Sequence, residues 1–484
     1  MEPSDRLMGT CTCCRRDFLQ AAAASAAMAL VSIESTAGAA EGPATARAKK
    51  TAVVRGAFLY PPSKTLEAQG YWSWPGSSFD AEGHQRQYMQ KITEIARKLG
   101  MRIIMDQEPL DQPESVARFI SDAKQSKPDG LLLVPFKKGH WEHVVRIVDE
   151  AQTPTVVLAT LGVLLVNQIN QLHRKPGAYL ISSLDDFEAL QYGMQMIRAA
   201  RWMQDARLLS ITGNQSRLAL LPQLGTEVRT IPHERFVAEF QRTEAKGEVL
   251  KLAKAYQENA KEIVEPSEAD ILEAAKCYFA LKRVLQAEQA DAVMMECLSG
   301  LRIPHKHVPP CMGFMSLRDE GIVAGCQADL SAALTMMLVE QLFERPGFQQ
   351  NASMNTERNL YFGAHCTSPS KMNGRSAPPE PYVLRNHAEA GWGCVPRVLL
   401  TPGQEVTMAQ YHPGKEPRMH VYSGKVVRCP SIPPAGGCRT NVEMTINEVA
   451  DVCDVKGMHQ IIFYGNHARR LRAFCQLFGI AVEV

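Results

Sequence analysis

Apolar residues in the first part of the chain follow two alternating spacings. The uninterrupted apolar run at 131–134 is typical of a strand buried on both faces, whereas Tyr88, Ile92, Ile95 and Leu99 share one face of a helix that stops at Gly100. The full pattern predicts strands at 51–60, 101–105, 131–134 and 155–159, with helices at 88–99, 116–123 and 141–148 between them. This order predicts a parallel sheet covered on both faces, with functional residues at the carboxyl ends of its strands.

A second α/β unit is predicted to begin near Ser182. Its pattern indicates a helix at 187–202, a strand at 207–212 and two helices separated by Pro266. Ser267 and Asp270 have the spacing of a capping arrangement, and apolar residues then follow at helical spacing, namely Ile271, Ala275, Tyr278, Leu281 and Leu285. This helix leads to a short apolar strand at 292–295, and Glu296 stands at its carboxyl end.

The pattern changes after Gly347 to one typical of antiparallel strands. Strands are predicted at 398–410, at 419–427 around a turn at Ser423 and Gly424, and at 441–446, followed by a helix and a last strand at 480–484. We therefore expect an α/β protein in which two parallel-sheet α/β domains, at 50–180 and 181–346, precede a β-rich domain at 347–484. That third domain is expected to be a small barrel or sandwich.

The N-terminus has the layout of an export signal. Arg15 and Arg16 precede Phe18 and Leu19, a short apolar run covers 21–31, and small residues follow up to Ala39. This order resembles a twin-arginine signal peptide over residues 1–40, cleaved near Ala39 and Ala40. The alternative, a membrane anchor, is disfavoured because a helix needs about 20 apolar residues to span a bilayer. We expect a periplasmic protein that the twin-arginine export machinery delivers, without stable membrane insertion.

Composition narrows the classes of function. The chain carries 53 basic and 51 acidic side chains, for a formal charge of +2, so nucleic-acid binding by charge is not expected. No G-x-G-x-x-G or Walker sequence follows a predicted strand, which disfavours a nucleotide site. Ten of the thirteen cysteines follow the signal peptide. Most are expected to be buried thiols, and a disulfide between Cys429 and Cys438 is an open alternative.

Two acidic residues and three histidines are the candidates for chemistry. Glu296 follows a strand, and Asp329 precedes an apolar helix, where its simplest role is the N-cap. The histidines are His365, His387 and His459, each of which taken alone is more often structural. Two carboxylates with one or two imidazoles would suit manganese or a similar divalent ion. His305 and His307 offer a competing metal site, but the prolines around them favour an exposed loop.

Two stretches resemble the L-fucose and L-arabinose isomerase superfamily. One runs from Pro310-Cys311-Met312-Gly313 to Asp329-Leu330-Ser331-Ala332-Ala333-Leu334-Thr335, and the other is Gly457-Met458-His459-Gln460-Ile461-Ile462-Phe463-Tyr464-Gly465-Asn466-His467. The resemblance extends over about 291–484. It implies two α/β domains and a β-rich domain, assembled as a homotrimer or homohexamer. It also implies interconversion of aldoses and ketoses with a divalent metal, most often Mn²⁺.

The resemblance assigns roles to particular residues. Glu296 matches the carboxylate that binds the metal and transfers the proton, and Asp329 matches the second catalytic carboxylate and metal ligand. His459 matches the C-terminal metal histidine, and His365 resembles an additional ligand of the arabinose branch. The remaining site candidates are expected to contact the sugar: His387, Gln327 and Trp392. Trp72 and Trp74 are further candidate faces for a sugar ring, although tryptophan is more often part of a core.

The chain departs from the superfamily pattern at two places. Gln327 occupies a position where many relatives have glutamate, and an acidic patch of the arabinose branch is Phe348-Gln349-Gln350-Asn351 here. Amides neither give charge to a metal nor accept a proton at neutral pH. Three functions are therefore open: a metal-dependent sugar isomerase that works through an enediolate, a metal-dependent carbohydrate lyase or epimerase, and an exported sugar-binding protein without turnover.

Overall fold

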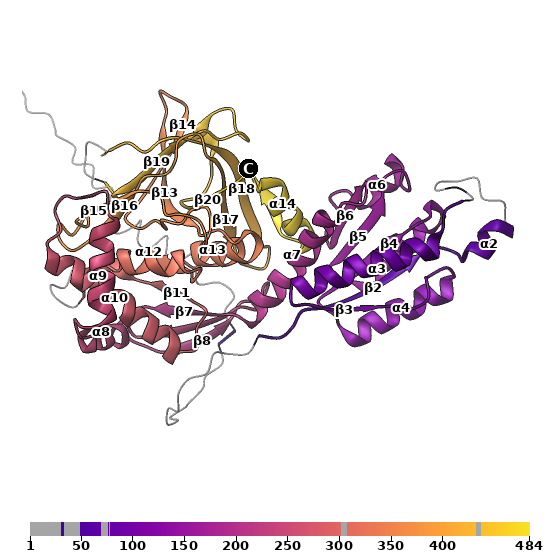
Figure 1. Cartoon of the computed structure of the whole chain (residues 1–484), viewed down its shortest axis with the longest axis horizontal. Coiled ribbons are helices and arrows are strands. Elements are labelled where there is room, and N and C mark those ends of the chain that lie inside the picture. The colour runs from indigo at the N-terminus through magenta and orange to yellow at the C-terminus, as the bar shows by residue number, and fades with distance from the viewer. Residues whose placement is uncertain (1–30, 33–48, 69–75, 77, 302–306, 432–436) are drawn as a thin grey trace, which may run out of the picture.

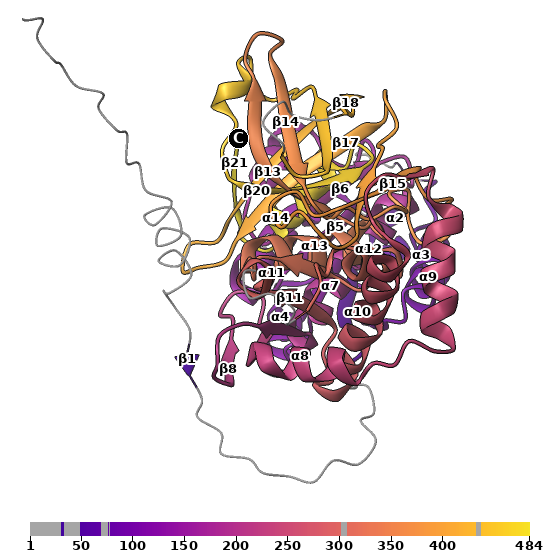
Figure 2. The same cartoon turned by 90° about the vertical axis from the view of Figure 1, so that its left-hand side faces the viewer.

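The first sheet is entirely parallel. The computed structural model describes residues 31–32, 49–68, 76, 78–301, 307–431 and 437–484, and Figures 1 and 2 show it from two sides. The strand order of the first sheet is β3 (Arg102–Met105), β2 (Val53–Leu59), β4 (Gly130–Pro135), β5 (Thr155–Thr160) and β6 (Ala178–Ser183). The parallel sheet predicted from the strand–helix alternation is thus confirmed.

Helices cover both faces of this sheet. Leu132 and Val134 of β4 pack with α3 (Ala81–Lys98) and α7 (Phe187–Asp205), whereas Leu131 and Leu133 face α4 (Pro113–Ser126) and α5 (Trp141–Ala151). All four side chains are buried, which explains why the run at 131–134 has no polar residue. Two short helices, α2 (Ser63–Ala68) and α6 (Val166–Leu172), and the 3₁₀ turn η1 (Lys138–His140) complete this part of the chain.

The second sheet combines a parallel centre with an antiparallel edge. Its order is β1 (Val31–Ser32), β8 (Arg217–Leu220), β9 (Glu227–Ile231), β7 (Arg207–Ile211), β11 (Ala292–Met295) and β12 (Ala324–Cys326), and the last four strands are parallel. One face packs against α8 (His233–Arg242), α10 (Glu268–Ala287) and α12 (Cys311–Asp319). Helix α9 (Glu248–Asn259) packs against α10, and the predicted capping box is confirmed by Ser267 N donating to Asp270 Oδ2 at 3.0 Å.

Helix α13 (Leu330–Phe343) lies between the second sheet and the C-terminal strands. It contacts β11 and β12 on one side, and β17 (Glu405–His412) and β20 (His459–Tyr464) on the other, as Figure 1 shows. Its side chains from Ala332 to Glu340 are all buried. A helix that is apolar on every side belongs inside a core, so the residue at its start is held between two layers of structure.

The C-terminal strands form a closed ring of antiparallel hydrogen-bonded neighbours. The order is β17, β20, β13 (Phe348–Asn355), β14 (Leu360–His365), β19 (Thr440–Met444) and β18 (Arg418–Arg428), and β18 pairs back to β17. The last strand, β21 (Ala481–Glu483), adds to β18 in parallel, after helix α14 (Ala468–Leu477). The β-rich end is therefore confirmed. A separate small sheet holds β10 (Glu262–Ile263), β15 (Tyr382–Arg385) and β16 (Val395–Val398), and two short helical segments are α11 (Cys297–Leu301) and η2 (Val452–Asp454).

Two predictions for this region were wrong. The strand predicted at 398–410 is two strands, because the chain turns through Gly403, at φ +82°, between β16 and β17. The turn predicted at Ser423 and Gly424 does not exist, since β18 runs straight through both residues. A Cβ at Gly424 would collide with the Thr445 carbonyl oxygen. This glycine therefore serves the close approach of a neighbouring segment.

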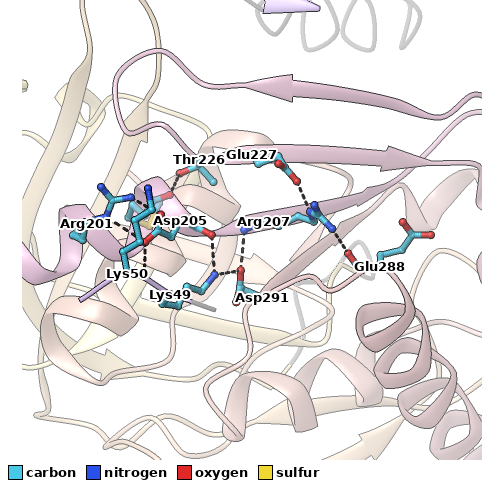
Figure 3. A network of polar contacts seen from close by, with 10 residues as sticks. Lys49, Lys50, Arg201, Asp205, Arg207, Thr226, Glu227, Glu288 and Asp291 are labelled. Atoms are coloured by element: carbon cyan, nitrogen blue, oxygen red, sulfur yellow. Dashed lines mark hydrogen bonds and ion pairs between the residues drawn. The ribbon is translucent and has the colours of Figure 1, made fainter. Parts of the chain in front are cut away.

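A polar network ties the start of the first sheet to the second. Lys49 Nζ lies 2.5 Å from Asp291 Oδ2 and donates to the Asp205 carbonyl oxygen at 2.9 Å (Figure 3). Asp291 also accepts from the backbone N–H of Arg207 at 2.8 Å. Lys49 precedes β2, Asp205 ends α7 and Asp291 precedes β11, so three segments distant in sequence meet at one place.

Candidate functional site

Asp329 is placed by an unusual turn at the end of β12. Gln327 and Ala328 both adopt left-handed backbone conformations, with φ values of +57° and +50°. Such conformations are uncommon for residues other than glycine, and they recur at functional sites. Asp329 then begins α13, where its Oδ1 accepts from the Ala332 N–H at 2.8 Å, so the predicted N-cap is confirmed.

Glu296 lies at the same edge of the second sheet. It follows β11, whose neighbour β12 pairs with it in parallel from Val293 and Ala324 to Met295 and Cys326. The Glu296 N–H donates to the Ile211 carbonyl at 3.0 Å, and the Ala328 N–H donates to the Met295 carbonyl at 3.0 Å. These bonds hold the loops after β7, β11 and β12 together, and Glu296 remains partly exposed. The carboxyl ends of adjacent parallel strands are the usual place for a site in such sheets.

Asp329 and His459 are in direct contact although 130 residues separate them. His459 Nδ1 lies 2.6 Å from Asp329 Oδ2, across the boundary between α13 and the ring of C-terminal strands. Burial raises the pKa of Asp329, but the hydrogen bond to His459 and the charge of that ring outweigh it and hold the pKa below its usual value. The ionised carboxylate therefore accepts from Nδ1–H, which leaves Nε2 as the ring nitrogen open to a ligand.

The ring of His365 stands beside this pair. Its ring is 5.8 Å from the His459 ring and steeply inclined to it, and the side chain is 5% exposed. Among the described residues, neither ring nitrogen has a hydrogen-bond partner, and burial holds the pKa far below the ordinary value. Buried polar atoms are almost always paired in native proteins. A neutral imidazole that lacks a partner fits a role as a ligand to something bound.

A small pocket opens next to His365. Its polar wall includes Gln327, Asn351, His387 and Glu389, so it brings two of the predicted sugar contacts to the place where His365 lies. The His387 ring is fixed, since Nδ1 accepts from the Ala390 N–H at 3.2 Å. The half-buried Trp392 does not line this pocket, and Trp72 and Trp74 lie outside the described residues.

The two amides of β13 have structural partners. Gln349 is fully buried, and its side chain accepts from the Cys326 N–H at 2.9 Å and donates to the Cys326 carbonyl at 3.2 Å. Gln350 Oε1 accepts from the Tyr361 hydroxyl at 2.7 Å. An ionised carboxylate at position 349 could not donate to the Cys326 carbonyl, because it has no N–H. This hydrogen bond explains why the chain has an amide here and not an acidic residue. Gln327 differs because it faces the pocket.

The donor chemistry of the site suits a divalent metal, although no finished coordination shell is formed. Within the described ranges, no three His, Cys, Asp or Glu side chains are grouped closely enough to enclose an ion. Asp329, His459 and His365 nevertheless offer one carboxylate and two imidazoles close together. Among the described residues, the two buried ring nitrogens of His365 have no hydrogen-bond partner. This set matches the mixture of oxygen and imidazole ligands that manganese accepts. The competing His305 lies outside the described residues, and His307 Nε2 faces His233 Nε2 at 3.1 Å.

Thiols form one wall of the same pocket, and the part that the sequence did not reveal is Cys438. The cysteines of this wall are Cys297, Cys311, Cys326, Cys366 and Cys438. All ten cysteines of the described chain are free, so the Cys429–Cys438 disulfide is absent here. The Cys429 thiol instead donates to the Leu400 carbonyl at 3.5 Å. Proximity of Cys311, Cys326 and Cys366 to the candidate ligands was a visible signal, but the position of Cys438 depends on the pairing of β14 with β19.

Comparisons with known proteins do not assign the chain to a family. No protein-family model matches it, and no curated protein matches it. Within the part of the chain that the structure describes, none of the helices has the length and apolar character needed to cross a membrane.

Proposed function

We propose that the protein is a metal-dependent aldose–ketose isomerase that acts on a sugar or sugar derivative. The observation that carries the proposal is the contact of Asp329 with His459 at 2.6 Å. His365, whose ring nitrogens have no hydrogen-bond partner among the described residues, lies beside this pair, and Glu296 stands at the same end of the second sheet. Glu296 follows β11, the strand that pairs with β12, and β12 leads to Asp329. The resemblance to the fucose and arabinose isomerases supplies the reaction class.

Asp329, His459, His365 and Glu296 would hold the metal, most suitably Mn²⁺. The ion supplies Lewis-acid stabilisation of negative charge on the sugar oxygens. Asp329 orients His459 through the Nδ1 hydrogen bond, and its low pKa keeps it ionised at neutral pH. Gln327 and His387 line the adjoining pocket and would bind sugar hydroxyls.

Glu296 would act as the base. It takes the proton from C2 of the aldose, which gives an enediolate, and returns the proton to C1 of the ketose. A hydroxyl proton moves in the same sense, from the oxygen on C2 to the oxygen on C1, so the composition of the sugar does not change. Partial exposure suits this role, because a proton-transferring carboxylate must reach the substrate.

The test is conversion of free sugars by the purified protein. We expect Mn²⁺-loaded protein to interconvert at least one aldose–ketose pair in a panel of pentoses and hexoses followed by NMR, and chelation to stop the reaction. Glu296→Gln should lower the rate by about 10²-fold or more. Glu94→Gln, an exposed change on α3, should leave the rate unchanged. Conversion at the wild-type rate by Glu296→Gln would remove that residue from the mechanism.

A second candidate function is sugar binding without turnover. Gln327 favours it, because this amide lines the pocket where a carboxylate would add charge for the metal. Saturable binding of a sugar by calorimetry, with no conversion in the Mn²⁺-loaded sample, would select this function over the isomerase. A product other than the matching ketose or aldose would instead indicate a lyase or epimerase.

We further propose that the chain is exported by the twin-arginine machinery and works in the periplasm as a homotrimer or homohexamer. In this proposal the three domains are 50–180, 181–346 and 347–484. Changing Arg15 and Arg16 together to lysine should retain the protein in the cytoplasmic fraction, whereas Arg6→Lys should not. Light scattering on the exported protein measures the number of subunits.

A further inference from the structure

Thiols form one wall of the pocket beside His365, and the proposed isomerase chemistry does not use them. Cys311 and Cys366 pack against each other with Val395, and Cys438 packs against this group. Apolar packing alone accounts for the fully enclosed cysteines, which behave as small hydrophobic residues. Cys438 is different, because it is only partly buried and lies at the pocket wall.

Strand pairing brings Cys438 to Cys366. Strands β14 and β19 are antiparallel, with His365 opposite Thr440 at the end of their ladder. Cys366 follows that pair by one residue and Cys438 precedes it by two, so the two thiols come from facing ends of neighbouring strands. The two side chains pack together and are hydrogen-bonded to each other.

His387 makes the third contact of this pair. Its side chain is hydrogen-bonded to Cys366. The Ala390 N–H donates to His387 Nδ1 at 3.2 Å, which fixes the ring beside the sulfur. Cys366 therefore has both the second thiol and a fixed imidazole in contact with it.

We propose that Cys366 and Cys438 are a redox-active pair that closes to a disulfide in the wall of the pocket. The oxidant is a small disulfide such as oxidised glutathione. The Cys438 thiolate attacks it, forms a mixed disulfide and releases one glutathione thiolate. The Cys366 thiolate then attacks the Cys438 sulfur, forms the Cys366–Cys438 bond and releases the second glutathione. Two protein thiols are oxidised, one glutathione disulfide is reduced, and the two protons pass through water to the released thiolates.

The order of these steps follows from exposure. Cys366 is 4% exposed and Cys438 is partly exposed, so an oxidant reaches Cys438 first and Cys366 resolves the intermediate. Disulfide formation would join the segment that follows β14 to the segment that precedes β19. His365 is the last residue of β14. The proposal stands apart from the isomerase, since it requires no metal or sugar.

The test is oxidation of the folded protein in a series of glutathione redox buffers, followed by peptide mapping by mass spectrometry without reductant. We expect a cross-linked peptide pair containing Cys366 and Cys438 and the loss of two titratable thiols. Cys366→Ser should trap one glutathione on Cys438, and Cys438→Ser should leave Cys366 reduced. Cys429→Ser is the matched control and should form the same disulfide as the wild type.

Two results would overturn the proposal. One is a disulfide between Cys438 and Cys429 in the native protein. The other is persistence of both thiols under conditions in which the exposed Cys453 of the same sample takes up glutathione, because this shows that the oxidant was active. If Cys366→Ser does not fold, as judged by circular dichroism, Cys366→Ala replaces it with the same expected adduct.

Discussion

Asp329 divides its two carboxylate oxygens between two elements. Oδ1 caps α13, and Oδ2 bonds His459 of β20. One side chain thus fixes the helix start and the ring strand relative to each other. Serine would cap the helix equally well but has a single oxygen, so the second bond explains why an acid occupies this cap.

His467 carries a pH dependence that belongs to one residue. Its ring stacks 4.4 Å from Phe343 and 5.9 Å from Phe463. Burial, followed by the charges of Arg345 and Arg470, lowers its pKa from 6.5 to about 4. His467 takes up a proton near pH 6.5 in the unfolded chain but only near pH 4 in the folded chain. The contribution of the neutral ring to the unfolding free energy is therefore fully present above pH 6.5 and is lost as the pH falls toward 4.

Replacing His467 with Phe should remove this loss. Between neutral and acidic pH, we expect the wild type to lose on the order of 2 kcal/mol more unfolding free energy than the variant. The loss is smaller than the full pKa shift would give, because part of the His467 ring remains in water. Urea unfolding at several pH values measures it. His173→Phe, at an exposed histidine, is the matched control variant. A difference for His467→Phe that stays constant with pH would contradict the assignment.

At the scale of elements, Gln349 joins the ring to the second sheet. Its amide pairs with both backbone groups of Cys326, so β13 and β12 are connected although they belong to different sheets. Gln349→Glu would lose the donor and bring a negative charge against the Cys326 carbonyl in a fully buried place. We expect a loss of about 3 kcal/mol in unfolding free energy at neutral pH.

The same variant should recover part of its stability in acid. A protonated glutamic acid regains an O–H that can donate to the Cys326 carbonyl, so the deficit shrinks as the pH falls below neutral. Gln286→Glu, on the exposed side of α10, should cost little at any pH. A Gln349→Glu protein as stable as the wild type at neutral pH would show that this amide does not hold the two sheets together.

Periodicity was sufficient for the elements whose burial is simple. It located the strand that ends at Met295, and hence Glu296, because β11 is buried throughout. It failed for β13, in which Gln349 and Gln350 are buried but polar. Their amides are satisfied by partners that only the folded chain provides, so their burial has no local signal. For the same reason the contact of Asp329 with His459 followed from no spacing and was suggested only by family resemblance.

At the scale of the whole molecule, the chain is held together by segments that cross between sheets. Helix α13 fills the space between the second sheet and the ring, and α14 packs on β6 of the first sheet, where Gln476 Nε2 donates to the Ala178 carbonyl at 2.7 Å. Both helices are visible in this connecting role in Figure 1. The candidate site therefore depends on the docking of sheets and not on one sheet alone.

The polar network of Figure 3 connects the first and second sheets at the amino end of β11, opposite the end that bears Glu296. Asp291 accepts from Lys49 Nζ at 2.5 Å and from the Arg207 N–H at 2.8 Å, so Asp291→Ala leaves a backbone donor and an ammonium without their partner. We expect a loss of about 1–3 kcal/mol in unfolding free energy and faster hydrogen exchange at the Arg207 amide. Asp149→Ala removes an exposed ion pair with Lys175 and should cost under about 1 kcal/mol. If Asp291→Ala and Asp149→Ala lose the same unfolding free energy, the network of Figure 3 contributes no more than an ordinary surface ion pair. The packing of the two sheets against each other must then depend on the apolar contacts of α7 and α13.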